Sequence, residues 1–274
     1  MTWSRIANAA KATLFSLYLT VFLIYLFAPL AIMGGAAFND SRFPTVTPWR
    51  ETTLRWFGEL FQDGTMWSAL WTSALIAAGV IAIALPVGTA AALVLTSLHA
   101  RVRGVLYGVM VSPLLTPGVV IGISTLVLWR TVGVGGGLFL IIVAQASFIT
   151  AYVMLMVLAR LQRFDPVQEE AAIVLGASRW LTFRRVLMPY LSPALLSAGF
   201  LAFLQSFENY NTTLFVRGLE TPLTVYIASR VRTGLTPAVN ALGLILIVVT
   251  IIGALIYEIA RRRAASRAAM VGPA

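Results

Sequence analysis

The sequence contains no cysteine, a single histidine, His99, and a single lysine, Lys11. Without cysteine there is no disulfide framework and no thiolate metal site, and one histidine excludes a histidine-rich metal cluster. A phosphate-binding Walker A loop needs a lysine at the end of a glycine-rich turn, and Lys11 does not lie in one. We therefore expect any ATP hydrolysis linked to this chain to belong to a partner.

Charged residues are also scarce, at 11%, whereas hydrophobic residues make up 59% of the 274 residues. This composition is typical of membrane proteins and lies far from that of soluble domains. The formal net charge of +10 comes almost entirely from arginines that flank apolar runs, which excludes a soluble basic face for nucleic acid. This placement predicts membrane topology and contact with anionic lipid.

Six apolar runs are long enough to cross about 30 Å of hydrocarbon. The third run contains Pro113 and Pro117, and broken backbone is tolerated inside a membrane where protein or a water-lined cavity covers it. We predict an all-α polytopic membrane protein with one domain at 14–262, an N-terminus at 1–13 and a tail at 263–274. The expected transmembrane helices are 14–34, 66–98, 104–129, 138–159, 191–216 and 237–259.

Basic residues predict the orientation of these helices. Six crossings place both termini on one side, and thirteen of the 20 Lys and Arg residues fall on that side. The positive-inside rule then makes both termini cytoplasmic. The thirteen are Arg5, Lys11, Arg101, Arg103, Arg160, Arg163, Arg179, Arg184, Arg185, Arg261, Arg262, Arg263 and Arg267.

The polar loop between the fourth and fifth runs, residues 160–190, predicts two short helices. Asp165 can cap the first helix, and Pro166 fits its first position. Gly176 should end it in a left-handed conformation, and Ser178 can cap the second. Such an elbow is expected either to dock on another protein or to lie at the headgroup level as an amphipathic connector.

The spelling of this loop resembles the cytoplasmic signature of permease subunits of type I ABC importers. The signature runs Glu-Ala-Ala, three residues, Gly, nine residues, an aliphatic residue, any residue, Leu and Pro. Met188 stands where the signature has Leu, and Val186 holds the aliphatic position. In that family the loop is the coupling helix that contacts the ATPase. The residues that match, and that the resemblance assigns to ATPase coupling, are Glu170, Ala171, Ala172, Gly176 and Pro189.

The resemblance extends from about residue 14 to residue 262. Within the family, the chain is similar to spermidine/putrescine-type permeases in two segments, FGELFQD after the first run and ARLQRFDPVQEEAA at the loop. It implies the type I ABC importer permease fold with a cytoplasmic coupling helix, in a bacterial inner membrane. The implied partners are two ATP-binding subunits, a second homologous permease in a heterodimer, and a periplasmic solute-binding protein, without cofactor or nucleic acid. The implied solute is a polyamine or related amine, and an opine, an aminophosphonate, thiamine and iron remain open.

The fifth run contains the polar segment QSFENYNTT, in which Glu208 is the only acidic residue well inside a predicted helix. A carboxylate costs a few kcal/mol in hydrocarbon, so Glu208 should face the bundle interior or water. It could meet a cationic or hydrogen-bonding solute, or it could be a structural acid paired with an arginine or helix-end amides. Helical spacing places four candidate pathway residues on one face, namely Gln205, Glu208, Asn209 and Thr212.

Two other classes of protein fit the sequence less well. An ion-coupled secondary transporter usually has several intramembrane charges and often an internal repeat, whereas this chain has one such acid and no convincing repeat. An intramembrane enzyme needs a nucleophile with its base, or metal ligands, within the apolar runs. Well inside the runs there is neither a histidine, a cysteine nor a second carboxylate, so we predict transport without covalent chemistry.

Overall fold

The computed structural model describes residues 2–234 and 236–270, and the regular secondary structure in this part of the chain is helical. One isolated antiparallel bridge joins Asn39 to Thr52. The chain divides into two compact units, of which one comprises Met1–Gly64 with Ser229–Ala274 and the other Thr65–Ala228. The second unit contains the segments that the sequence singles out for coupling and for the pathway.

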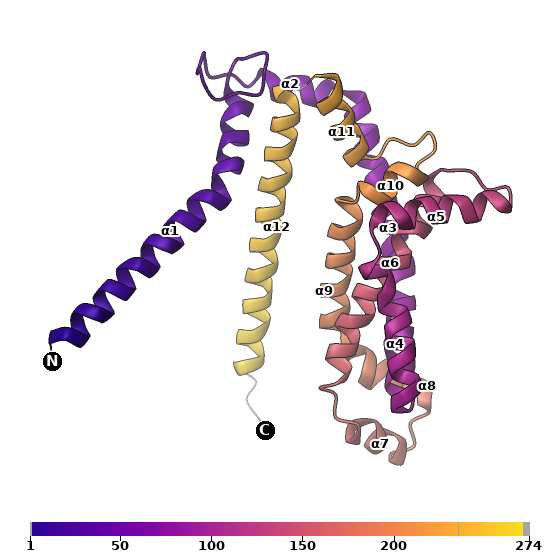
Figure 1. The fold of residues 1–274 in the computed structure, drawn as a ribbon. Coiled ribbons are helices and arrows are strands. Elements are labelled where there is room, and N and C mark those ends of the chain that lie inside the picture. Colours follow the sequence, from indigo (N-terminus) through magenta and orange to yellow (C-terminus); the bar gives the residue numbers. More distant parts are fainter. Residues whose placement is uncertain (1, 235, 271–274) are drawn as a thin grey trace. The chain divides into compact units, whose positions relative to one another are not determined.

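The second unit is organised around α6 (Leu138–Leu161), which is apolar on all sides and packs against helices on several sides. A helix of this kind is stable only where neighbours cover it. In Figure 1, α9 (Met188–Phe207) runs beside α6, with α4 (Ala100–Leu115) close by. The other helices are α3 (Gly64–Ser97), α5 (Gly118–Thr131), α7 (Val167–Val174), α8 (Arg179–Thr182), the π-helical turn η1 (Phe183–Leu187), α10 (Asn211–Val216) and α11 (Leu223–Thr233), which continues into the first unit.

Four helical stretches are long and apolar enough to cross a membrane, namely Lys11–Phe38, Gly64–Ser97, Leu138–Leu161 and Arg179–Phe207. In the last helix, the apolar part that the structure describes is Pro237–Gly253, which is shorter than these four stretches. A fifth crossing is counted if α4 and α5 form one span, but they are bent by 103° relative to each other. The all-α polytopic architecture is therefore confirmed.

The predicted run 104–129, whose prolines allow broken backbone, is not one straight helix, because the chain turns sharply between α4 and α5 (Figure 1). Thr116 has extended backbone angles, φ −88° and ψ 129°, as a residue before proline prefers. Pro117 has no N–H to continue α4 and instead starts α5, where its carbonyl accepts from the amide of Ile121. The proline signal was visible in the sequence, but the angle was not.

The continuous helix predicted at 191–216 is also wrong, because α9 ends at Phe207 and α10 begins at Asn211. The side chain of Asn209 provides the reason for the restart. Its Oδ1 accepts the backbone N–H of Thr213 at 3.2 Å and the Thr213 hydroxyl at 3.2 Å. An asparagine that bonds nearby backbone in this way competes with helix continuation and caps the next helix.

The first unit contains α1 (Thr2–Phe38), α2 (Arg55–Gln62) and α12 (Pro237–Met270). The loop before α2 is held by Asn39, whose Nδ2 donates to the carbonyls of Thr45 and Pro48, at 2.8 and 3.1 Å. The Asn39 carbonyl accepts from Trp56 Nε1 at 2.9 Å, which ties the loop to the buried face of α2. Helix α2 contains most of the segment FGELFQD.

Within the second unit, Gly88 of α3 marks a close approach to α6. A Cβ at this position would lie 2.8 Å from the Thr150 carbonyl oxygen and 2.8 Å from Val153 Cβ, which is shorter than side chains tolerate. We expect Gly88→Ala to push α3 and α6 apart and to lower the free energy of unfolding by about 1–3 kcal/mol, as overpacking of a core usually does. Thermal unfolding of the purified protein measures this loss.

The control is Gly108→Ala on α4, where an added Cβ meets nothing within 4 Å. Both changes raise helix propensity equally, so only the packing differs. Equal unfolding temperatures of the two variants would contradict the close α3–α6 packing.

Candidate functional site

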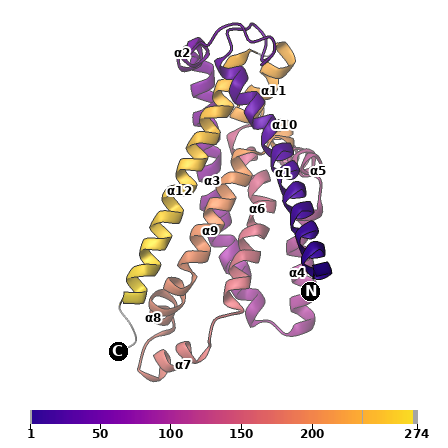
Figure 2. The same ribbon diagram turned by 90° about the vertical axis from the view of Figure 1, so that its left-hand side faces the viewer.

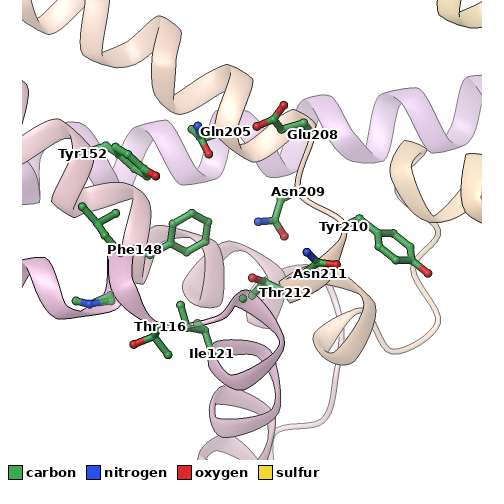
Figure 3. A pocket seen from close by; sticks show the side chains of 13 residues that line it. Thr116, Ile121, Phe148, Tyr152, Gln205, Glu208, Asn209, Tyr210, Asn211 and Thr212 are labelled. Carbon is green, nitrogen blue, oxygen red and sulfur yellow. The ribbon is translucent and has the colours of Figure 1, made fainter. Parts of the chain in front are cut away.

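A cavity of about 300 Å³ lies between the two helix breaks of the second unit. Its wall comes from three places: the turn between α4 and α5, the middle of α6, and the end of α9 with the start of α10. Figure 3 shows how their side chains surround it. The lining residues are Pro113, Leu114, Thr116, Gly118, Ile121, Phe148, Tyr152, Gln205, Glu208, Asn209, Tyr210, Asn211 and Thr212.

All four predicted pathway residues line this cavity, but not on one helical face. Gln205 lies in the last turn of α9, Glu208 and Asn209 in the break, and Thr212 in α10. The break therefore places these residues around a common space, where the predicted continuous helix would have stacked them. Glu208 is solvent-exposed and is the only charged residue of the wall.

A buried hydrogen-bond network fixes the break against α6. Gln145 of α6 is 1% exposed; its Oε1 accepts from the Ser206 hydroxyl at 2.6 Å, and its Nε2 donates to Thr213 Oγ1 at 2.8 Å. Thr213 in turn donates to Asn209, and the Asn209 carbonyl accepts from the Thr224 hydroxyl at 3.1 Å. One amide side chain thus bonds the segments on both sides of the break.

Helix α5 packs closely on α10 because two of its residues are glycines. A Cβ at Gly122 would lie 2.7 Å from the Thr212 carbonyl oxygen, and one at Gly118 would lie 2.8 Å from Thr212 Oγ1. Thr212 is fully buried, and its hydroxyl has no hydrogen-bond partner among the described residues. A buried hydroxyl without a partner costs about 1–3 kcal/mol, so this cavity-lining group is able to take a bond from a ligand or water.

Two aromatic side chains of the wall, Phe148 and Tyr152, were not among the predicted site residues. They follow Gln145 on α6 at spacings of three and seven residues, which places all three on one helical face. That spacing was a signal in the sequence. The spacing alone did not identify these two residues as part of the site, because the sequence does not show that this face of the fourth run packs against the fifth run.

The two short helices predicted in the loop at 160–190 form an elbow between the end of α6 and the start of α9 (Figure 2). Asp165 Oδ1 accepts the N–H of Val167 at 3.0 Å at the start of α7. Gly176 has φ +89°, and the amides of Gly176 and Ala177 return to the carbonyls of Ile173 and Ala172, respectively. This pair of bonds is the Schellman motif, and its left-handed residue favours glycine.

The second elbow helix begins at Ser178, whose Oγ accepts the N–H of Leu181 at 3.2 Å. This agrees with the predicted cap. Of the residues that match the family signature, Glu170, Ala171 and Ala172 lie in α7, Gly176 ends it, and Pro189 lies in the first turn of α9. Pro189 and the cavity residue Gln205 therefore lie at opposite ends of α9.

The elbow exposes apolar side chains. Val174 and Leu175, at the end of α7, are 85% and 87% exposed, and Trp180 of α8 is 67% exposed while stacked on Phe183. Exposed apolar residues gathered on a polar loop are typical of a protein-binding surface.

The two stems of the elbow are clamped together. Arg160 at the end of α6 donates from Nε to the Tyr190 carbonyl at 3.2 Å, and the Tyr190 hydroxyl donates to the Arg160 carbonyl at 3.2 Å. The Arg160 guanidinium also lies 4.0 Å from the centroid of the Tyr190 ring, which favours a cation–π contact. These contacts hold the end of α6 and the start of α9 together at the base of the loop.

Sequence comparison relates the chain to transport proteins. The family described as "Binding-protein-dependent transport system inner membrane component" matches residues 84–266. The chain is 36% identical over 248 residues to the putrescine transport system permease protein PotI of Escherichia coli K12, with 87% of each chain covered. It is 30% identical over 247 residues to the spermidine/putrescine transport system permease protein PotC of Haemophilus influenzae, covering 90% of this chain and 95% of that one.

Structure comparison supports the same fold. A chain from the crystal structure of a bacterial alginate ABC transporter, in complex with an alginate pentasaccharide-bound periplasmic protein, superposes with a TM-score of 0.70. The match covers 96% of this chain and 98% of that chain at 17% identity, so it concerns the fold alone. The chain belongs to the family of binding-protein-dependent transport system inner membrane components, the permease subunits of ABC importers.

The network around Gln145 makes a prediction about stability. Gln145→Leu keeps approximately the side-chain volume but leaves the buried hydroxyls of Ser206 and Thr213 with a lost partner each. We expect a loss of about 1–3 kcal/mol from the Ser206 hydroxyl, which is left unsatisfied, whereas the Thr213 hydroxyl keeps its bond to Asn209. Thermal unfolding of the purified protein, together with proteolysis at the α9–α10 break, measures the effect.

The matched control is Ser147→Ala on the same helix, since the Ser147 hydroxyl bonds only to the Ala144 carbonyl within α6. A Gln145→Leu protein as stable and as protease-resistant as the control would show that the network does not hold the break.

Proposed function

We propose that this chain forms, together with a second homologous permease, the membrane pathway of an ATP-driven importer for a polyamine or related amine. A periplasmic binding protein delivers the solute. The observation that carries the proposal is the cavity between the helix breaks, whose only charged residue is a carboxylate, Glu208. The putrescine and spermidine/putrescine permeases named above support an amine as the solute.

The wall of the cavity suits an ammonium group. Glu208 supplies a negative charge, and the faces of Phe148 and Tyr152 supply the aromatic surface that cations favour, worth about 0.5–2 kcal/mol for each contact. The Thr212 hydroxyl and the side-chain amides of Gln205 and Asn209 offer hydrogen bonds. No basic residue lines the cavity, so a cation meets no repulsion there.

The alternative interpretation of Glu208, a structural acid paired with an arginine, has little support. Glu208 forms no ion pair among the residues that the structure describes. Arg217, the nearest arginine along the chain, donates to the carbonyl of Glu220 at 2.8 Å. A carboxylate that is not needed to balance a fixed charge is available for a solute.

The elbow is the proposed contact with an ATP-binding subunit, and two such subunits would serve the permease pair. Its exposed apolar residues, Val174 and Leu175, provide the surface, and Glu170 stabilises α7 through negative charge in the first turn. Hydrolysis belongs to these partners. The elbow then has to be cytoplasmic, as the arginine distribution predicts, with both termini on the same side of six crossings.

Movement of the elbow has a direct route to the cavity. The chain runs from α8 through η1 into α9 without a loop, and α9 ends at Gln205 and Glu208. The Arg160–Tyr190 clamp adds α6, which carries Phe148 and Tyr152. Closure of the ATPases would therefore tilt both helices together and open the cavity alternately to the two sides of the membrane.

The charge of Glu208 is tested by Glu208→Gln. The variant keeps the shape of the side chain, and we expect assembly, thermal stability and ATPase coupling to stay as in the wild type. Uptake of putrescine per assembled complex in proteoliposomes should fall about tenfold or more, because a hydrogen bond to a charged group contributes about 1.5–3 kcal/mol.

Glu220→Gln is the control, since Glu220 lies outside the cavity wall in the loop after α10. Normal uptake by a stable Glu208→Gln complex would remove the charge role and with it the structural argument for a cationic solute. A loss of assembly without a loss of uptake per complex would instead identify a structural acid.

The coupling role of the elbow is tested by Gly176→Val. A β-branched residue is strained at φ +89°, so the elbow should distort while the helices remain inserted. We expect reduced co-purification of the ATP-binding subunit and reduced solute-stimulated ATPase activity.

Gly133→Val is the matched control, because Gly133 has φ +81° and open space around it but lies in the turn after α5. It carries the same backbone strain at a different place. Equal coupling in the two variants would show that the elbow does not contact the ATPase.

A further inference from the structure

A second cavity, of about 590 Å³, lies at the other end of the second unit, between the end of α3, the start of α4 and the end of α6. It shares no lining residue with the cavity around Glu208. Arg103 and Tyr107 of α4 and Gln162, directly after α6, provide its polar wall, and leucines such as Leu155 and Leu158 provide its apolar wall. The transport function assigned above does not use any of these residues.

The polar wall offers donors that the chain itself does not use. Within the described residues, the guanidinium of Arg103 forms no ion pair or hydrogen bond, and the same holds for the Tyr107 hydroxyl and the Gln162 amide. No aspartate or glutamate lines the cavity. By contrast, Arg160, two residues before Gln162, is fully engaged with Tyr190. A ligand for Arg103 therefore has to be an anion from outside the chain.

The polar and apolar walls follow one another along the helices. Arg103 lies in the first turn of α4, and Gln162 lies just past the last residue of α6. Leu155 lies seven residues before Gln162, or about 10 Å deeper along α6. Polarity thus falls from the end of the helices inwards, as it does from headgroup to acyl chain in a phospholipid.

We propose that this cavity binds an anionic phospholipid. The planar guanidinium of Arg103 receives the phosphate, to which Tyr107 and Gln162 donate further hydrogen bonds. One acyl chain lies along Leu155 and Leu158. Basic pockets between transmembrane helices at the cytoplasmic side are a recognised form of headgroup site. A free phosphate or nucleotide shares the headgroup chemistry, but neither would use the apolar wall.

The charge of the site is tested on the assembled complex, purified from membranes and washed with detergent. Native mass spectrometry then counts the retained phosphatidylglycerol and cardiolipin. We expect Arg103→Gln to lower retention about tenfold, the factor that corresponds to about 1.4 kcal/mol. Arg101→Gln, which removes the same charge from an exposed position outside the cavity wall, should retain lipid as the wild type does.

The shape of the site is tested by filling it. Gly104 lines the cavity, and a Cβ there meets nothing within 4 Å, so we expect Gly104→Leu to fill part of the space. Gly108→Leu, one turn further along α4, is equally free of contacts but lies outside the cavity wall. We expect the first variant to lose the retained lipid and the second to keep it.

The source of the phosphate is tested by competition. Inorganic phosphate and ATP should not displace the lipid, and reconstitution into phosphatidylcholine vesicles should leave the site without anionic lipid until phosphatidylglycerol is added. Displacement by inorganic phosphate or ATP would overturn the lipid assignment. So would equal lipid retention by Arg103→Gln and Arg101→Gln. A loss of the second permease from Arg103→Gln complexes, with retained lipid unchanged, would assign the cavity to a protein contact and would also overturn the proposal.

Discussion

Inside a bilayer, every backbone group that leaves a helix must find its hydrogen bond within the protein or in a water-lined cavity. Two of the helix breaks in the second unit, after α4 and after α9, line the same cavity. Gln145 stabilises the second break, because its side-chain amide forms hydrogen bonds with Ser206 on one side of the break and with Thr213 on the other. The cavity exists because the breaks are placed together and covered together.

The sequence predicts the elements whose causes are local. The ends of α3 and α6 fall within a few residues of the predicted runs, and the elbow forms with the predicted cap at Ser178 and the left-handed turn at Gly176. The break at Glu208 was missed because no proline or glycine marks it. Asn209 favours the restart locally, and the bond between Ser206 and Gln145, which are 61 residues apart, holds the break; helical periodicity carries no information about such a contact.

The four residues predicted for the pathway nevertheless line one cavity. Their polarity in an apolar run was the informative feature, since polar groups at this depth need a common solvent or partner whatever the backbone does. The residues of other helices that complete the cavity wall could not be predicted. Phe148 and Tyr152 line the cavity only because α6 packs on α9. Helix α10 lies close to Gly118 only because glycine has no Cβ.

A transport pathway must bind its solute well enough to draw it from water and weakly enough to release it. A single exposed carboxylate with two aromatic faces and neutral dipoles meets both conditions better than a closed charged cage would. Exposure of Glu208 keeps its attraction for a cation partly screened by water, whereas the unpartnered Thr212 hydroxyl adds a bond that depends on position. Under the proposed function, high affinity and selection among amines would be the task of the binding protein. The permease would then supply only a modest counter-charge, Glu208, at the end of the helix whose start is joined to the elbow.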